Sequence, residues 1–169
     1  YIMSFYSKLT TEITSLVEGE RNYVANCANV ASVIYNELNK SAKDGQVNWA
    51  GFYFVDKSAS FPQLVLGPFM GEPACIRIKI GKGVCGTVAK SKEALVVRDV
   101  HEFPGHIACD SRSNSEVVVP IVHPDSKELI GVLDLDSLVV NGFDDNDKEN
   151  LSIIASIVAS ACDWTHVLG

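Results

Sequence analysis

Two apolar runs joined by a short turn constrain the fold of this chain most. Residues 117–122 and 129–135 are rich in valine and leucine, and the segment Pro124-Asp125-Ser126 between them is typical of a turn. The pattern predicts a β-hairpin. Four earlier segments that carry aromatic or β-branched residues are further strand candidates, namely 49–55, 64–69, 76–80 and 95–98.

Helical patterns flank these strands on both sides. Residues 4–18, which Gly19 is expected to end, and residues 22–39 carry apolar residues at helical spacing. A short helix is expected over 84–90. A last helix, capped by Asp144 or Asp145, is expected to extend through Thr165. Residues 1–169 therefore predict one α+β domain, in which helices at both ends surround a six-stranded, mostly antiparallel sheet.

The composition excludes several classes of function. The chain has 14 basic and 21 acidic residues, a net charge of −7 and no basic run, so it lacks the electrostatic footprint of a nucleic-acid-binding protein. No apolar stretch approaches the about 18 residues of a membrane helix, so no membrane partner is expected. Because no targeting segment is recognisable, we expect a cytoplasmic protein.

The five cysteines divide into two kinds. An odd number in a chain of ordinary composition argues against a disulfide-stapled secreted fold and favours transient pairing in catalysis or sensing. Cys27 and Cys162 occupy apolar positions of predicted helices, which predicts buried packing thiols. Cys75, Cys85 and Cys109 instead lie in turn-like or glycine-rich polar sequence, where a thiol is more often reactive.

Three loop cysteines together with His101 and His106 also raise the question of a zinc site. No cysteine pair has the C-x₂₋₄-C spacing of common structural sites, so no metal is expected. The two histidines are candidates for tuning the ionisation of Cys109, because a neighbouring imidazolium lowers a thiol pKa. The simpler alternative is a pair of ordinary loop histidines.

Five segments of the chain resemble the free methionine-(R)-sulfoxide reductase family. They are residues 48–53 (NWAGFY), 81–87 (GKGVCGT), 104–110 (PGHIACD), 115–121 (SEVVVPI) and 131–137 (GVLDLDS). The resemblance implies a single GAF-like domain, with N- and C-terminal helices packed on one face of the sheet and loops that close a pocket on the other. It also implies that Cys109 is the catalytic nucleophile, Cys75 the main resolving cysteine, and Cys85 an auxiliary or alternative partner.

Reduction of a sulfoxide needs an acid as well as a thiolate, because the departing oxygen must acquire a proton. Carboxyl groups that crowd together raise one another's pKa, and Glu116, Asp134 and Asp136 are the candidates. Asp134 and Asp136 are two residues apart on a predicted strand and should point to one face, while Leu133 and Leu135 face the core. Our hypothesis is that Glu116 and Asp136 polarise and protonate the oxygen, and that Asp134 helps to hold the substrate ammonium group.

Two aromatic residues are candidates for contacting the substrate methyl group. Trp49 and Tyr53 lie four residues apart on a predicted strand, hence on one face, where they can form an apolar wall. An ordinary aromatic core is the alternative. The resemblance places both rings at the pocket, and it implies that Ile107 and Ala108 are further substrate-binding residues.

The resulting prediction is an enzyme that reduces free L-methionine-(R)-sulfoxide without a bound cofactor. In this scheme Cys109 becomes a sulfenic acid, Cys75 condenses with it to a disulfide, and a thioredoxin-type donor, supplied by NADPH, reduces that disulfide. The alternatives are a non-enzymatic GAF ligand-binding module, a thiol redox sensor and a thiol peroxidase. A homodimer is compatible with the sequence, which does not itself argue for one.

Overall fold

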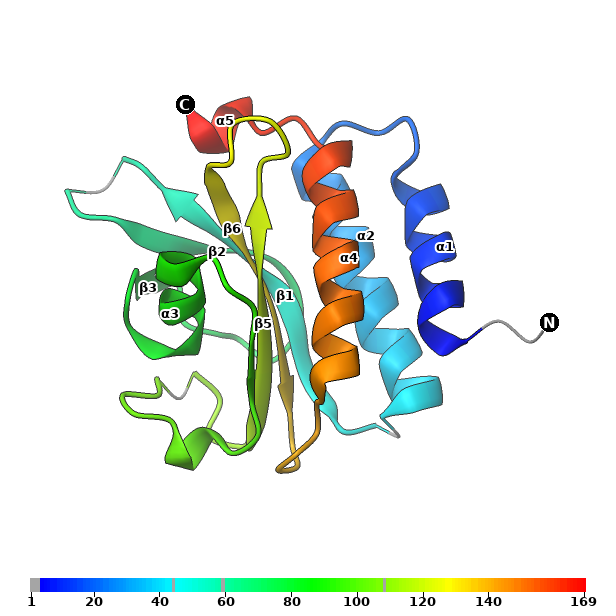
Figure 1. The fold of residues 1–169 in the computed structure, drawn as a ribbon, viewed down its shortest axis with the longest axis vertical. Coiled ribbons are helices and arrows are strands. Elements are labelled where there is room, and N and C mark those ends of the chain that lie inside the picture. The colour runs from blue at the N-terminus through cyan, green and yellow to red at the C-terminus, as the bar shows by residue number, and fades with distance from the viewer. Residues whose placement is uncertain (1–3, 44, 59, 108) are drawn as a thin grey trace.

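Six antiparallel strands form the centre of the protein (Figure 1). The computed structural model describes residues 4–43, 45–58, 60–107 and 109–169. The strands lie in the order β3-β2-β1-β6-β5-β4, and every neighbouring pair is antiparallel. Their bounds are β1 Val47–Asp56, β2 Gln63–Gly71, β3 Arg77–Lys79, β4 Leu95–Val97, β5 Ser115–Val122 and β6 Leu129–Ser137. The predicted hairpin is thus confirmed as β5 and β6, and the predicted α+β class with an antiparallel sheet is confirmed as well.

Helices cover the two faces of the sheet unequally. Three helices, α1 (Phe5–Val17), α2 (Tyr23–Glu37) and α4 (Asp145–Ala161), form a layer on one face (Figure 1). The shorter α3 (Gly83–Ser91) lies on the other face. The remaining helical segments are η1 (Leu38–Ala42), η2 (Val100–Glu102) and α5 (Thr165–Leu168). Within the described residues, no helix has the length and apolar character needed to cross a membrane.

Polar residues set where the long helices begin. Ser4 and Asn22 each accept a hydrogen bond from the backbone N–H three residues ahead, at 3.2 and 3.0 Å. Asp144, one of the two predicted caps, forms a capping box with Asp147. Gly19 (φ +78°) lies in the turn just beyond α1, where Glu18 is already extended and the backbone N–H of Glu20 donates to the carbonyl of Val17 at 3.3 Å.

The last helix is shorter than its apolar pattern predicts. α4 ends at Ala161 and a separate helix begins at Thr165, so the prediction of one helix through Thr165 is wrong. Cys162 is extended (φ −97°, ψ 158°), and the backbone N–H of Asp163 donates to the carbonyl of Arg21 at 2.8 Å instead of continuing the helix. The Asp163 carboxylate accepts hydrogen bonds from the backbone N–H and the hydroxyl of Thr165, which starts the new helix.

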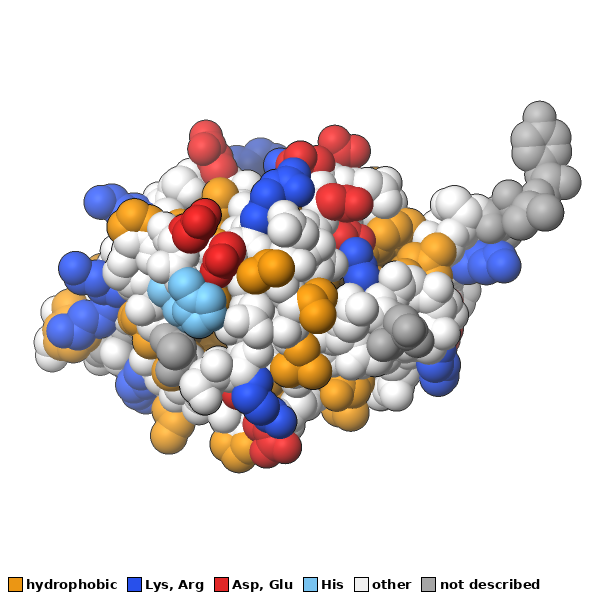
Figure 2. Space-filling view, turned by 90° about the horizontal axis from the view of Figure 1, so that it is seen from below, with side chains coloured by type: hydrophobic (Ala, Val, Ile, Leu, Met, Phe, Trp, Pro, Cys, Tyr) orange, Lys and Arg blue, Asp and Glu red, His pale blue; other side chains and the backbone are white. Residues whose placement is uncertain are grey.

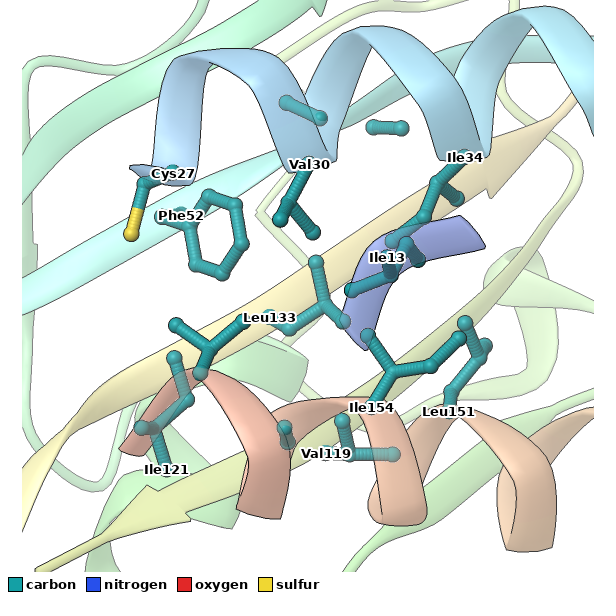
Figure 3. Packing of buried hydrophobic residues seen from close by; sticks show 14 of the residues in the cluster. Ile13, Cys27, Val30, Ile34, Phe52, Val119, Ile121, Leu133, Leu151 and Ile154 are labelled. Carbon is teal, nitrogen blue, oxygen red and sulfur yellow. The ribbon is translucent and has the colours of Figure 1, made fainter. Parts of the chain in front are cut away.

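The main core lies between the sheet and the three-helix layer (Figure 3). It combines fully buried side chains of helices and strands, among them Ile13, Val30, Phe52, Leu133 and Ile154. Cys27 and Cys162 lie in this core at 0% and 3% exposure, which confirms their prediction as buried thiols. Leu133 and Leu135 face the core, whereas Asp134 between them points to the opposite side of β6.

A smaller apolar cluster lies under α3 on the opposite face of the sheet. Val84 and Val88 of α3 pack there with Val118 of β5 and Val132 of β6. This contact holds α3 against the strands that carry the acidic residues, and a cavity remains beside it.

Candidate active site

The predicted site residues meet in a cavity on the α3 side of the sheet. With the Cys75–Cys109 disulfide formed, the cavity is narrow, and a water-sized molecule can enter about 40 Å³ of it. The sequence-predicted residues that line it are Trp49, Tyr53, Cys85, Ile107, Cys109, Glu116, Asp134 and Asp136. Ala108, also predicted to bind substrate, lies outside the described residues.

The register of β5 and β6 brings the three carboxyl groups together. Glu116 lies directly opposite Asp136, and Asp134 is two residues further along the same face of β6. Glu116 and Asp134 are each only 6% exposed, and Asp136 is partly buried. The prediction that Asp134 and Asp136 share a face is therefore confirmed, and Glu116 joins them across the hairpin.

Burial raises the pKa of all three carboxyl groups. Removal from water raises the pKa of Glu116 well above its ordinary value, and the charge of Asp136 raises it further. Burial raises the pKa of Asp134 and Asp136 in the same way, and neighbouring carboxylates add to the effect. Because the groups repel one another when ionised, each favours the protonated form of its neighbours. An acid for a departing oxygen needs this property.

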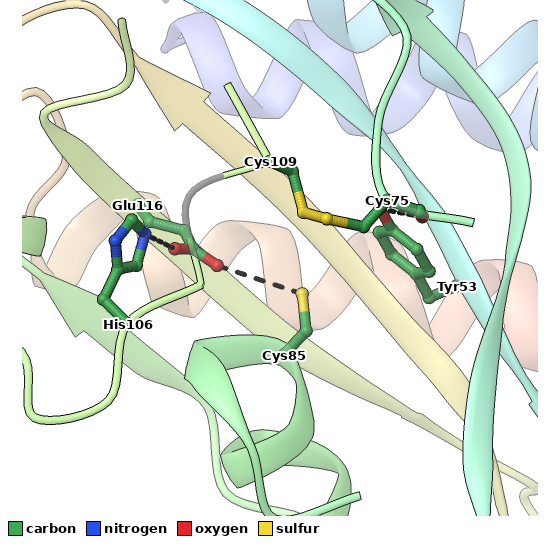
Figure 4. The surroundings of a disulfide bond; sticks show 6 residues. All are labelled: Tyr53, Cys75, Cys85, His106, Cys109 and Glu116. Atoms are coloured by element: carbon green, nitrogen blue, oxygen red, sulfur yellow. Dashed lines mark hydrogen bonds and ion pairs between the residues drawn. A yellow bond between two sulfur atoms is a disulfide. The ribbon is translucent and has the colours of Figure 1, made fainter. Parts of the chain in front are cut away.

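Cys85 lies in the first turn of α3 and points at Glu116. Its Sγ lies 3.9 Å from Oε1 of Glu116 (Figure 4). The neighbouring Gly86 lets α3 pack closely on the end of β3, because a Cβ there would lie 2.4 Å from the backbone oxygen of Lys79. Burial, and then the charge of Asp134, raise the pKa of the Cys85 thiol. The thiol therefore stays protonated and is poorly activated as a nucleophile.

Cys75 and Cys109 form a disulfide at the edge of the cavity (Figure 4). Their Cα atoms lie 5.3 Å apart, and the bond links the segment between β2 and β3 to the loop after η2. The Tyr53 hydroxyl donates to the carbonyl of Cys75 at 3.0 Å, which ties this segment to β1. Both bonded cysteines are partly exposed, whereas Cys85 is a buried free thiol. The two bonded cysteines are thus the pair for which the family resemblance implies the roles of nucleophile and resolving thiol.

A polar network that sequence reasoning missed holds the loop after Cys109. Arg112 binds the Asp110 carboxylate through Nε and Nη2 at 3.0 and 2.7 Å. The Asn48 amide, at the start of β1, donates to both Asp110 and Ser113, at 3.2 and 3.0 Å. The sequence offers one indication of this network, the asparagine that begins the NWAGFY segment. A single polar residue does not show which residues it binds.

Trp49 and Tyr53 lie on one face of β1 and line the cavity, and both are also buried in the apolar cluster under α3, at 3% and 1% exposure. Trp49 and Tyr53 stack with ring centroids 5.8 Å apart, and Phe69 of β2 stacks on Trp49 at 5.2 Å. Gly51 between them makes room, because a Cβ there would lie 2.3 Å from Cβ of Phe69. The indole N–H of Trp49 is buried without a hydrogen-bond partner in the described part of the chain. The wall therefore combines apolar surface with one unused donor.

The sequence matches the GAF domain family over residues 9–162. It is 45% identical over 155 residues to the free methionine-R-sulfoxide reductase of Saccharomyces cerevisiae, which covers 92% of this chain and 84% of that protein. The protein of the same name from Escherichia coli is 43% identical over 87% of this chain and 82% of its own length. The chain belongs to the free methionine-(R)-sulfoxide reductase family.

Solved structures of this family share the fold. The free methionine-R-sulfoxide reductase of Neisseria meningitidis, solved in complex with its substrate, is 40% identical and has a TM-score of 0.84 over 92% of this chain and 87% of that chain. The Staphylococcus aureus counterpart in its reduced form is 45% identical, with a TM-score of 0.80 over 92% and 94%. The GAF fold implied by the sequence resemblance is therefore confirmed.

The two candidate histidines occupy different places. His106 lines the cavity, and its Nε2 lies 3.6 Å from Oε2 of Glu116. Partial burial lowers its pKa. His101 lies in η2, where its exposed ring pairs with the Asn114 side chain at 3.0 Å, and it is not among the described residues that line the cavity. On the face seen from below, Figure 2 shows a histidine patch beside acidic side chains. Tuning of Cys109 by either ring stays a prediction.

Cys85, Glu116 and Asp134 place three atoms that can bind a metal close together. Sγ of Cys85 and one carboxylate oxygen each of Glu116 and Asp134 all lie within 4.8 Å of one another. The set consists of one sulfur from α3, one oxygen from β5 and one oxygen from β6. It therefore differs from the closely spaced cysteine pairs of common structural zinc sites.

Proposed function

We propose that this protein reduces free methionine-(R)-sulfoxide to methionine. One observation carries the proposal: the Cys75–Cys109 disulfide lies at the edge of a cavity whose floor holds carboxyl groups of raised pKa. A dithiol can supply the two electrons of the reduction, and a protonated carboxyl can supply the proton that the departing oxygen needs. The named relatives act on this substrate, which supports the assignment.

In the proposed cycle, the Cys109 thiolate attacks the sulfoxide while Glu116 and Asp136 polarise and protonate its oxygen. The attack forms a bond between the Cys109 sulfur and the substrate sulfur, and the S–O bond breaks as the protonated oxygen leaves as water. A water molecule then attacks the Cys109 sulfur, the bond to the substrate sulfur breaks, methionine leaves with that electron pair, and Cys109 is left as a sulfenic acid. The Cys75 thiol then attacks this sulfur, releases water and forms the disulfide. Cys85 is the reserve thiol, because it is reduced and faces the same cavity.

Recognition of a free amino acid follows from the same cavity. Trp49 and Tyr53 form a wall against which the S-methyl group packs. Asp134, whose Oδ1 has no hydrogen-bond partner among the described residues, offers a carboxylate oxygen to the substrate ammonium group. Ile107, 42% exposed, lies at the rim. A site that binds the α-ammonium group excludes methionine sulfoxide within a peptide chain.

Regeneration requires an external dithiol. We assign this role to a thioredoxin-type donor fed by NADPH, because the disulfide is partly exposed and a thiolate can reach it. Such donors maintain the reducing state of the cytoplasm, and we place the protein there. We propose that residues 1–169 form a single GAF-like domain, and assembly into a homodimer stays a prediction.

The test is NADPH consumption with thioredoxin and its reductase. Free L-methionine-(R)-sulfoxide, the (S) epimer and a peptide-bound sulfoxide are offered separately. We expect turnover with the free (R) form alone, abolished in Cys109→Ser. Cys162→Ala is the matched control, since it removes a buried thiol at the far side of the sheet and should keep the activity. Full turnover in Cys109→Ser contradicts the proposal.

A redox sensor is the second candidate, because the same disulfide can form without turnover of a sulfoxide. Peroxide would then oxidise the pair reversibly, and none of the three sulfoxides would be reduced. Equal rates with peroxide and with the sulfoxide would instead indicate a thiol peroxidase. A ligand-binding GAF module would show neither reaction.

A further inference from the structure

We propose that Cys85, Glu116 and Asp134 form a binding site for a soft divalent cation, with Zn²⁺ and Cd²⁺ as the ions of fitting chemistry. The ion is not a cofactor; it occupies the cavity in place of the substrate. Binding of the ion does not depend on the proposed function, whereas its effect on turnover does.

The geometry of the three donors favours an ion. They come from α3, β5 and β6, which are packed rigidly against one another by the apolar cluster under α3. The Sγ to Oε1 distance is 3.9 Å, and all three donor atoms fit within 4.8 Å. Ligand atoms around a tetrahedral zinc ion lie roughly 3.5 Å apart, so small side-chain rotations bring these atoms to the required spacing.

An orphaned atom marks the site as incomplete. Asp134 is 6% exposed, yet its Oδ1 has no hydrogen-bond partner in the part of the chain that the structure describes. Buried carboxylate oxygens are normally paired, and an unpaired one costs free energy. A cation satisfies this atom. The same oxygen is the one offered to the substrate ammonium group, so ion and substrate exclude each other.

The charges around the cavity point in the same direction. Four carboxyl groups line it, whereas Lys82 and His106 are the basic side chains among its described lining residues. Arg112 pairs with one of the four, Asp110, at 2.7 Å. A divalent ion takes the place of the protons on Glu116, Asp134 and Cys85, and the Cys85 sulfur selects soft ions over Mg²⁺ or Ca²⁺.

The disulfide form makes the test specific. When Cys75 and Cys109 are bonded to each other, neither can ligate a metal, while Cys85 stays free. Cd²⁺ titrated into the oxidised protein should therefore give a saturable, one-to-one thiolate-to-metal charge-transfer band in the ultraviolet. We expect Cys85→Ser to abolish the band and Asp134→Asn to raise the Cd²⁺ dissociation constant at least about tenfold.

The controls separate this site from the other free thiols. Cys27 and Cys162 are both buried and free, and Cys162→Ala should keep the band. Circular dichroism establishes that each variant is folded, and Asp134→Asn tests the site without altering any thiol. A band absent from the wild type, retained in Cys85→Ser or lost in Cys162→Ala overturns the proposal.

Discussion

Replacement of Glu116 by Gln distinguishes the contribution of this side chain to catalysis from its contribution to the stability of the protein. Gln keeps the size of the side chain but cannot give up a proton. In the structure, the carboxyl of Glu116 lies 3.9 Å from the Cys85 sulfur and 3.6 Å from His106, so the amide can occupy the same place. The variant therefore removes the acid while leaving the cavity packed.

The expected loss of rate follows from the role of a general acid. Positioned proton transfer contributes about 10²- to 10⁴-fold to a reaction, which corresponds to about 3–5 kcal/mol of activation free energy. We expect kcat to fall by this factor in Glu116→Gln. The KM should change much less, because the substrate ammonium group is assigned to Asp134 and the methyl group to Trp49 and Tyr53.

Although Glu116→Gln should lose activity, it should gain stability at high pH. The pKa of Glu116 is raised in the folded state by burial, so the folded protein holds a proton that the unfolded chain releases above its ordinary pKa of about 4.3. Folding at higher pH must take this proton back, and the free energy of unfolding falls by up to about 1.4 kcal/mol for each pH unit between the two pKa values. Gln carries no such penalty. Glu116→Gln should therefore unfold at a higher temperature than the wild type at pH 8, with a gap that narrows toward pH 4.

Two assays check the pair of expectations. The thioredoxin-coupled assay gives kcat and KM, and thermal unfolding followed by circular dichroism gives the stability at each pH. Glu128→Gln is the control, since that carboxyl is half exposed, pairs with Lys57 at 3.3 Å and lies away from the cavity. A Glu116→Gln variant that keeps more than about a tenth of the wild-type kcat refutes the acid assignment. One that unfolds at a lower temperature at pH 8 refutes the argument from burial.

Three further variants test other parts of the structure. Cys75→Ser should release about one methionine per chain and then stop, as counted by rapid quenching, because the sulfenic acid has lost its main resolving thiol; continued fast turnover would mean that Cys85 resolves equally well. Leu133→Ala, at a site of 0% exposure, should lower the free energy of unfolding in urea by about 2–5 kcal/mol. Gly86→Ala places a Cβ 2.4 Å from the Lys79 carbonyl oxygen, so α3 must shift, and we expect a stability loss of about 1–3 kcal/mol with faster labelling of Cys85 by a thiol reagent. An unchanged melting temperature would show that this contact relaxes freely.

The sheet and its layers were predictable because their signals are local. Alternation along residues 129–135 correctly assigned Leu133 to the core and Asp134 to the other face. The end of the last helix was not predictable, because it depends on a hydrogen bond between Asp163 and Arg21. These residues lie far apart in the sequence, and no local pattern records such a contact.

The candidate site was predictable in its members and not in its geometry. Residue type and resemblance identified Glu116, Asp134 and Asp136, but their pairing across the hairpin depends on strand register. The pairing of His106 with Glu116, and the hold of Asn48 on the loop after Cys109, depend on distances between separate segments. A sequence lists donors and acceptors; only the folded chain decides which of them meet.

The register of the hairpin has a consequence for how this chain can vary. Because Glu116 lies opposite Asp136, sliding one strand by a single residue would turn a whole row of side chains to the other face and carry carboxyl groups into the helix-side core. The turn at residues 123–128, at the other end of these strands, helps to fix that alignment through the hydrogen bond from His123 to the carbonyl of Glu128. An insertion or deletion in this turn that shifts the register by one residue would therefore move Glu116 out of the cavity. A segment that does not contact the substrate thus determines whether the proposed acid lies in the site.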